Sequence, residues 1–165
     1  MPEKYRRFFL KDREAKGLLA EITEKLDINL EHAFKTRINL EIIETEFAKI
    51  YIINNKPLIA KFGEDIFPTL VSLEAFPSIP KVVVDMGAIP HVCNGADVMA
   101  PGIVRVYGEI RKGGFVFVVD EKYGKPLAVG EVLYEMNDAS RVKKGVVVRN
   151  LHFVGDKLWN FIKEK

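Results

Sequence analysis

The sequence is short of several features that would indicate a secreted or membrane protein. Its one cysteine, Cys93, excludes an internal disulfide and a cysteine-based zinc site. No apolar run reaches the roughly 18 residues that suggest a membrane span, and no signal-peptide core follows the charged first residues. We therefore expect a protein of the reducing cytoplasm, with no membrane partner. Glutamine is absent while Lys and Glu are abundant, a bias typical of proteins from hot-living organisms.

Excess charge of either sign is also lacking. Lys and Arg number 25 against 23 Asp and Glu, a net charge of +2, which is too small to indicate nucleic-acid binding by itself. Any such binding would need a local patch. Hydrophobic residues make up 48% of the chain and charged residues 29%, so a packed core is expected and disorder is not.

Residue clusters that would carry catalysis are scarce. The three histidines lie far apart in the sequence and show no metal-ligand spacing. Cys93 lies two residues after His91, a poor arrangement for a nucleophile and its base, and no third member is evident. Phosphate-loop and dinucleotide-binding motifs are absent as well. We therefore expect no enzyme, no catalytic residue, no metal and no cofactor.

The first half of the chain predicts a small α/β domain. Apolar residues recur at helical spacing near its start, and β-branched and aromatic residues then alternate as in strands. The expected elements are a strand at 5–10, a helix at 12–26 capped by Asp12, a helical turn at 30–34, an antiparallel meander over 37–62 with a turn at 54–57, and a short helix opened by Pro68.

Two prolines bracket residues 77–80, where we place a boundary between domains 1–77 and 78–165. The second part is rich in short strands separated by turns, which is typical of a small barrel or sandwich. The expected strands are 82–84, 103–107, 115–119, 127–134, 146–149 and 157–162, with a short helix capped by Asp138 before the fifth.

The stretch 84–103 is the most informative part of the second domain. Its glycines tolerate positive φ and allow close approach to the backbone. Pro90 falls inside the expected helix, which must therefore be very short, bent or of 3₁₀ type. A glycine turn beside a helix can offer backbone N–H groups to phosphates or base edges.

The order Asp85-x-Gly87-Ala88 and then Gly95-Ala96-Asp97-Val98-Met99-x-Pro101-Gly102-Ile103 resembles the signature of the PUA domain, an RNA-binding module. With Phe67-Pro68-Thr69-Leu70 before it and Asn150-Leu151-His152-Phe153 after it, the chain resembles the malignant T-cell-amplified sequence proteins, called translation machinery-associated proteins in yeast. The resemblance implies an α+β protein of archaeal type. It would pair a small N-terminal pre-PUA α/β domain, with its antiparallel meander, with a C-terminal PUA pseudo-β-barrel.

The resemblance also implies a function. It predicts a non-enzymatic protein that binds the acceptor end of tRNA, or rRNA, at the small ribosomal subunit or with a translation factor, during initiation, re-initiation or recycling. The implied RNA-binding positions are Gly87, Ala88, Gly95, Ala96, Asp97, Val98, Met99, Pro101 and Gly102, with Lys81, Arg105, Arg149 and Phe153 nearby.

Structural explanations remain open for several of these residues. Asp85 is more simply a helix cap than an RNA contact, and Asp97 could accept from a base amino group or form an Asx turn. Val98, Met99 and Phe153 could meet a stacked base, as could Tyr107, or belong to the core. Two other functions also remain: an RNA-targeting accessory subunit of a tRNA- or rRNA-modifying enzyme, and a protein-interaction module without RNA binding.

Overall fold

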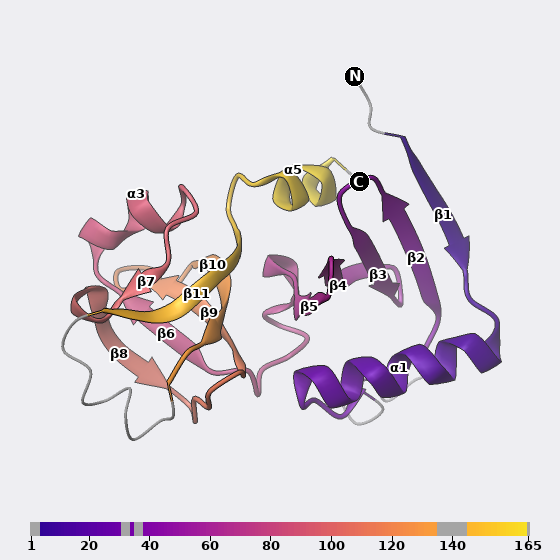
Figure 1. The fold of residues 1–165 in the computed structure, drawn as a ribbon, viewed down its shortest axis with the longest axis horizontal. Coiled ribbons are helices and arrows are strands. Elements are labelled where there is room, and N and C mark those ends of the chain that lie inside the picture. The colour runs from indigo at the N-terminus through magenta and orange to yellow at the C-terminus, as the bar shows by residue number, and fades with distance from the viewer. Residues whose placement is uncertain (1–3, 31–33, 35–37, 135–144, 165) are drawn as a thin grey trace. The chain divides into compact units, whose positions relative to one another are not determined.

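The computed structural model describes residues 4–30, 34, 38–134 and 145–164 (Figure 1). The chain forms two compact units, Met1–Phe76 and Pro77–Lys165. The first contains an antiparallel sheet and the second a curled mixed sheet with short helices, so the expected α+β class is confirmed. Within the described ranges, no helix has the length and apolar character needed to span a bilayer.

The N-terminal sheet is an uninterrupted meander, as its alternating pattern predicts. Its strands lie in chain order and pair antiparallel throughout; they are β1 (Tyr5–Phe9), β2 (Leu40–Thr45), β3 (Lys49–Ile53), β4 (Lys56–Phe62) and β5 (Asp65–Pro68). The turn before β4 is shorter than expected. It uses only Asn54 and Asn55, both at positive φ, so that Lys56 and Pro57 already belong to the strand.

Helix α1 (Asp12–Leu26) contacts β5 of this sheet, and its residues Ile22 and Leu26 are buried. Its cap differs from the prediction, because the N-cap residue is Lys11 and no side chain caps the helix. Asp12 instead stands in the first turn, where a carboxylate interacts favourably with the helix dipole. The helical turn expected at 30–34 lies mostly outside the described residues.

The expected helix after Pro68 is also different. Pro68 ends β5, where it pairs with Ile59, and only a 3₁₀ turn, η1 (Leu70–Ser72), follows. Thr69 explains the early turn, because its hydroxyl donates to the carbonyl of Pro57 at 2.7 Å and its carbonyl accepts from the hydroxyl of Ser72 at 2.7 Å.

The C-terminal sheet has the strand order β7-β11-β10-β9-β6-β8, in which only β6 and β9 pair parallel. Its strands are β6 (Lys81–Val84), β7 (Val98–Met99), β8 (Ile103–Tyr107), β9 (Phe115–Asp120), β10 (Pro126–Val132) and β11 (Val146–Phe153). The two-residue strand β7 was not predicted, and the helix expected after Asp138 lies outside the described residues.

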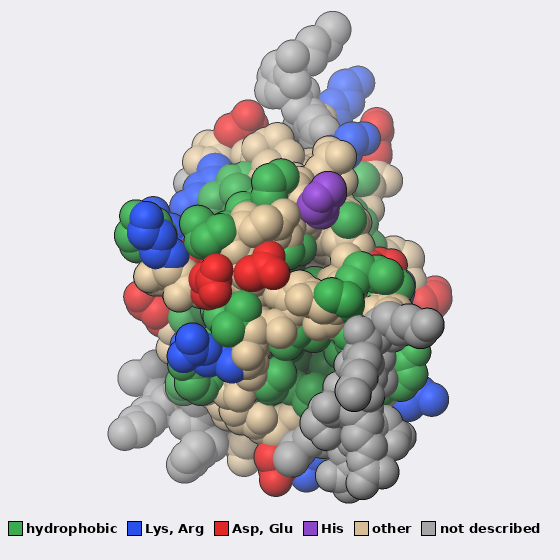
Figure 2. Space-filling view, turned by 90° about the vertical axis from the view of Figure 1, so that its left-hand side faces the viewer, with side chains coloured by type: hydrophobic (Ala, Val, Ile, Leu, Met, Phe, Trp, Pro, Cys, Tyr) green, Lys and Arg blue, Asp and Glu red, His purple; other side chains and the backbone are tan. Residues whose placement is uncertain are grey.

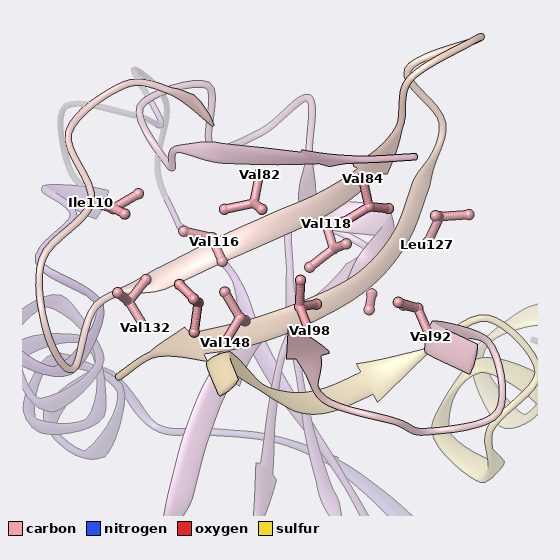
Figure 3. Close-up of a cluster of buried hydrophobic side chains, with 12 residues drawn as sticks. Val82, Val84, Val92, Val98, Ile110, Val116, Val118, Leu127, Val132 and Val148 are labelled. Carbon is pink, nitrogen blue, oxygen red and sulfur yellow. The ribbon is translucent and has the colours of Figure 1, made fainter. Parts of the chain in front are cut away.

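The core of this unit consists of small branched side chains that point inward from facing strands (Figure 3). On β6, Val82 and Val84 lie in this core, so the alternate residues Lys81 and Val83 belong to the other face of the sheet. Gly130 on β10 lies so close to β11 that an added Cβ would stand 2.2 Å from Val148 Cγ1. The strand pair β10–β11 therefore requires glycine at this point.

The prediction of a final strand at 157–162 is wrong, because α5 (Lys157–Lys163) is a helix. Asp156 starts it: one carboxylate oxygen accepts from the N–H of Trp159 at 2.7 Å. The other oxygen accepts from the N–H of Phe153 at 2.9 Å and lies 2.7 Å from His152 Nδ1. Leu158, Phe161 and Ile162 then recur at helical spacing and are buried.

Candidate nucleic-acid interface

The glycine-rich stretch folds around one hollow of the C-terminal unit, with a volume of about 540 Å³. Four short elements supply seven of its eleven described lining residues: η2 (Met86–Ala88), α3 (Ile89–Val92), β7 and the 3₁₀ turn η3 (Ala100–Gly102). We call this hollow the cradle. Its lining residues are Asp85, Ala88, His91, Val92, Ala96, Asp97, Val98, Met99, Pro101, Gly102 and Val146.

Short-range hydrogen bonds hold the helical side of the cradle. The Asp85 carboxylate accepts from the N–H of Ala88 at 2.9 Å, which confirms that it caps the turn. Pro90 is tolerated because it stands in the first turn of α3, where its missing donor costs no helical bond. The helix is accordingly one turn long and preceded by a 3₁₀ turn, as Pro90 predicts.

The expectation that the glycine turn presents its N–H groups to a ligand is wrong for residues 93–96. The N–H of Gly95 donates to the carbonyl of Val92 at 3.0 Å, and that of Ala96 donates to the carbonyl of His91 at 3.0 Å. Those of Cys93 and Asn94 also donate within the helical turn. The turn is therefore closed on itself, and the cradle offers side chains rather than these amides.

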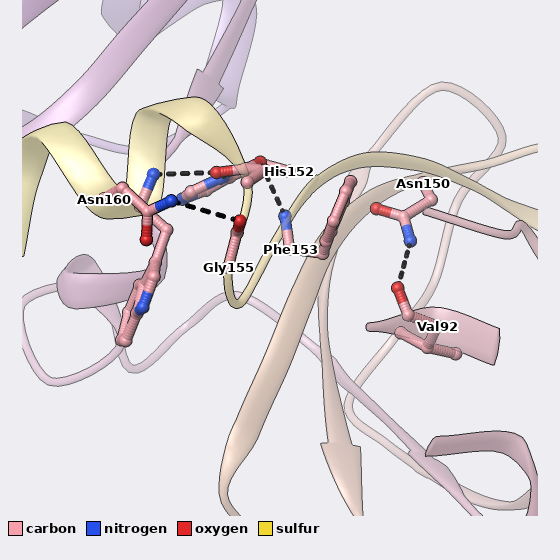
Figure 4. Close-up of polar contacts among 8 residues, drawn as sticks. Val92, Asn150, His152, Phe153, Gly155 and Asn160 are labelled. Atoms are coloured by element: carbon pink, nitrogen blue, oxygen red, sulfur yellow. Dashed lines mark hydrogen bonds and ion pairs between the residues drawn. The ribbon is translucent and has the colours of Figure 1, made fainter. Parts of the chain in front are cut away.

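Asn150 on β11 ties the turn to the sheet (Figure 4). Its side-chain Nδ2 donates to the carbonyls of Val92 at 3.1 Å and Ala96 at 2.9 Å, and its backbone N–H donates to Asp97 Oδ1 at 2.8 Å. Asp97 thus makes a long-range contact rather than an Asx turn. Sequence reasoning gave Asn150 no role, although the residue stands in the quoted motif.

The two apolar residues of β7, Val98 and Met99, lie in different surroundings. Val98 is buried in the core, whereas Met99 keeps 47% of its surface exposed at the cradle wall. The described lining residues include two carboxylates and His91 but no Lys or Arg. On the face of the C-terminal unit shown in Figure 2, hydrophobic side chains are spread widely; acidic side chains lie near the middle and also at the margin, where the basic ones lie.

The cradle brings together seven of the predicted RNA-binding residues: Ala88, Ala96, Asp97, Val98, Met99, Pro101 and Gly102. Gly87 and Gly95 do not line it. A Cβ on Gly87 would lie 3.4 Å from Asp85 Oδ1, and one on Gly95 would lie 3.1 Å from the Phe153 ring. Gly95 therefore permits close packing against Phe153, a partly buried residue packed against the core, whereas a Cβ on the exposed Gly87 would make only an ordinary contact.

The predicted basic residues lie elsewhere. Lys81 and Arg105 line a second hollow with Tyr107. Arg149 on β11 is paired with Glu131 on β10, with Arg149 Nη2 3.0 Å from Glu131 Oε1. The sequence did not predict His91, Val92 and Val146 as lining residues, and it favoured Asp85 as a cap; no simple pattern would have marked the first three.

The described residues give no sign of a reactive centre. Burial raises the pKa of the Cys93 thiol above its ordinary value of 9.0, which disfavours the thiolate that a nucleophile needs. Within this part of the chain, no three His, Cys, Asp or Glu side chains gather as a metal site.

Comparison with known proteins supports the reading of both units. The PUA domain model matches residues 80–154, and the model of a domain of unknown function, DUF1947, matches residues 6–75. Uncharacterized protein MJ1432 of Methanocaldococcus jannaschii is 39% identical over 157 residues, which cover 94% of this chain and 96% of that protein. The chain belongs to this family of two-domain PUA proteins.

The family reaches into eukaryotes. Translation machinery-associated protein 20 of Saccharomyces cerevisiae is 28% identical to this chain, and the aligned residues cover 92% of this chain and 88% of the yeast protein. Malignant T-cell-amplified sequence 1-B of Xenopus laevis is 32% identical to this chain, and the aligned residues cover 70% of this chain and 66% of the Xenopus protein. The PUA domain is an RNA-binding module, and the yeast relative is named for its association with the translation machinery.

Solved archaeal structures share the fold of the family. A PUA domain protein, APE0525 of Aeropyrum pernix, has a TM-score of 0.82 at 25% identity, covering 97% of this chain and 92% of its own. Hypothetical protein PH0734.1 of Pyrococcus horikoshii has a TM-score of 0.75 at 33% identity, and the match covers 94% of this chain and 98% of that protein. The resemblance read from the sequence is therefore confirmed over almost the whole chain.

Proposed function

We propose that this PUA protein binds the acceptor end of tRNA in its cradle, at the small ribosomal subunit, and acts in initiation, re-initiation or recycling without catalysing a reaction. The N-terminal domain, residues 1–77, would dock on the ribosome or on a translation factor in the cytoplasm. The proposal takes the RNA-binding role of the PUA domain and the translation-associated relatives as its starting point.

The chemistry of the cradle is the observation that carries the proposal. A hollow whose described lining has no Lys or Arg is poorly suited to bind the phosphates of a duplex. Met99 and Pro101 instead provide an apolar surface for a base that has left its stack. The Asp97 carboxylate, already oriented by Asn150, can accept from an exocyclic amino group.

The single-stranded end of a tRNA provides such bases without any cost of opening a helix. Its terminal nucleotides can be splayed apart and read on their edges, which is how single-stranded RNA is usually recognised. The Cys93 thiol is partly buried and desolvation raises its pKa, which also supports a binding role over a nucleophilic one.

The test is the affinity of the purified protein for tRNA with and without its 3′-terminal CCA, measured by fluorescence anisotropy across a salt series. We expect removal of CCA to weaken binding about tenfold, because the stacking of one or two bases is lost. Met99→Glu places a charge in the cradle and should cause the same loss on intact tRNA.

Met86→Glu is the matched control for this variant. Met86 has 43% of its surface exposed, close to the 47% of Met99, but it does not line the cradle. Equal binding of intact and trimmed tRNA by the wild-type protein would overturn acceptor-end recognition. Equal losses in the two glutamate variants would show that charge anywhere on this unit is harmful, and would remove the cradle from the proposal.

A further inference from the structure

A second hollow, of about 500 Å³, lies on the outer face of the C-terminal sheet. It shares no lining residue with the cradle in the described part of the chain. We call it the sheet-face hollow. Its lining residues are Pro77, Ser78, Ile79, Pro80, Lys81, Val83, Arg105, Tyr107, Gly108, Val119, Asp120, Glu121 and Gly124.

Strand register brings the key side chains onto this face. Lys81 on β6 stands opposite Tyr107 on the antiparallel strand β8, and Val83 stands opposite Arg105. On its other side, Val83 pairs with Val119 of β9. Because alternate residues of a strand share a face, Lys81 and Val83 lie together here, while their neighbours on β6 enter the core.

The floor and the rim of the sheet-face hollow differ in character. Val83 and Val119 are almost fully buried and provide an apolar floor. Tyr107 at the rim is 54% exposed, and its hydroxyl lies 3.3 Å from Arg105 Nη1. An exposed ring held beside a guanidinium is well suited to stack a base and to meet the adjoining phosphate.

The cations of this hollow are available to a ligand. Among the described residues, no carboxylate forms an ion pair with Lys81 or Arg105, unlike Arg149 with its partner Glu131. The two acidic residues of the lining already have partners. Glu121 accepts from the N–H of Met86 at 3.2 Å, and Asp120 accepts from the backbone of its own turn.

The turn that Asp120 organises adds further cations and an aromatic ring. Tyr123 is 66% exposed, with Lys122 Nζ 5.2 Å and Lys125 Nζ 5.9 Å from its ring centroid. The wall on the opposite side is fixed by the close approach of Gly108 to Pro80, since a Cβ on Gly108 would lie 3.3 Å from the proline. The hollow is thus bordered by ordered backbone.

We propose that the sheet-face hollow binds one nucleotide of single-stranded RNA, separately from the cradle. The base would stack on Tyr107 over the valine floor, and its phosphate would meet Arg105 and Lys81. This inference rests on the proposed function only in taking RNA as the ligand. It requires no acceptor end and no tRNA.

The experiment compares intact tRNA, CCA-trimmed tRNA and a single-stranded pentauridylate by fluorescence anisotropy. Tyr107→Ala and Arg105→Ala should each weaken binding about tenfold, by the same factor for both tRNAs, because the contact is remote from the 3′ end. Arg105→Ala should also reduce the slope of log affinity against log salt by about 0.7, the value for one phosphate of a single strand.

Matched controls come from the same unit. Tyr134→Ala removes another tyrosine exposed to solvent, and Lys157→Ala removes a cation from the exposed side of α5; neither residue lines the hollow, and neither variant should change binding. Tyr107→Phe keeps the ring and should bind like the wild type. Thermal denaturation establishes that each variant is folded.

Each result bears on one of the two proposals. Unchanged binding in folded Tyr107→Ala and Arg105→Ala would overturn the sheet-face site and leave the cradle untouched. Weaker tRNA binding by these variants, together with equal binding of intact and CCA-trimmed tRNA by the wild-type protein, would support this site and overturn acceptor-end recognition. An amide chemical-shift titration with uridine 5′-monophosphate distinguishes a free nucleotide from a nucleotide within RNA. If the mononucleotide saturates the hollow at the same concentration as pentauridylate, the hollow is a site for free nucleotides, and the assignment to RNA is overturned.

Discussion

The two hollows of the C-terminal unit are built in opposite ways. The cradle consists of single helical turns, a two-residue strand and a side-chain clamp from Asn150. The sheet-face hollow lies on regular strands whose register alone brings Lys81 to Tyr107. The described lining of the cradle is apolar apart from two carboxylates and His91, and the sheet-face hollow carries Lys81 and Arg105, which form no ion pair with any described carboxylate, beside the ring of Tyr107.

Under the two proposals, this difference would divide the tasks of RNA binding between two places. A site whose described lining holds no cation can discriminate between bases but gains little attraction from phosphates, whereas a cationic rim gains affinity for any strand. Specificity would then belong to the cradle and much of the affinity to the sheet face. Perturbing one hollow at a time tests that division.

In the C-terminal sheet, the strand pair β10–β11 connects β7 of the cradle to strands β9, β6 and β8 of the sheet-face hollow, so breaking it should have the largest effect. In Gly130→Ala the new Cβ would stand 2.2 Å from Val148 Cγ1 and 2.8 Å from the carbonyl oxygen of Arg149. We expect a loss of about 3 kcal/mol in the free energy of unfolding, measured by chemical denaturation. Gly17→Ala in α1, where nothing lies within 4 Å, should instead stabilise the protein by about 0.5–1 kcal/mol. A Gly130 variant as stable as the wild type would contradict this packing.

Loss of the Asn150 amide should damage the cradle alone. Asn150→Ala removes the side-chain donor from the carbonyls of Val92 and Ala96, although the Val92 carbonyl still accepts from the N–H of Gly95, and we expect a loss of about 2 kcal/mol in stability. Amide hydrogen exchange should accelerate at residues 93–97 and not at 120–125. Asn160→Ala, which removes one exposed 3.3 Å bond to Gly155, is the control and should cost much less. Uniform acceleration over both segments would show that the clamp is not local.

A smaller effect is expected at Gly95, which separates backbone strain from packing. Gly95 has φ +92° and its Cβ position meets the Phe153 ring, whereas Gly113 has φ +84° with nothing within 4 Å. Gly113→Ala should cost about 1 kcal/mol through its φ alone, and Gly95→Ala about 1.5 kcal/mol through both causes. Thermal denaturation of the two variants measures the difference. Equal losses would mean that the ring moves aside freely.

The cradle was far more visible in the sequence than the sheet-face hollow. Gly95 to Gly102 form a continuous motif, so most of the lining could be named from one stretch of chain. Lys81, Arg105 and Tyr107 were each named for charge or aromatic character, but their grouping depends on the pairing of β6 with β8. No local pattern specifies which strands of a sheet become neighbours.

The wrong strand at residues 157–162 has a different origin. These residues are apolar and aromatic enough to predict a strand, and the decisive feature is the Asp156 carboxylate, which caps the helix while contacting His152 and Phe153. This cap is a local signal that the apolar composition outweighed in the prediction. The meander of the first unit, in contrast, was predicted well because successive strands pair in chain order.

The Asp120 turn provides the mildest test of the comparison, because protonation of its carboxylate should loosen one wall of the sheet-face hollow. Burial alone would raise the pKa of Asp120, but backbone N–H donors led by Tyr123 and Lys125 outweigh it and lower the pKa below its ordinary 3.8. A carboxyl whose pKa is lower in the folded state stabilises the turn fully above its unfolded pKa, and that stability is lost as the pH falls through the folded value. We therefore expect amide shifts of residues 121–125 to change below about pH 3.8, and Asp120→Asn to remove this dependence. The pKa of Asp156 is also lowered, but Asp156 lies at the start of α5, so site-resolved NMR distinguishes its protonation from that of Asp120. If the turn at residues 121–125 is unchanged at pH 2.5, its backbone holds the wall without the charge of Asp120.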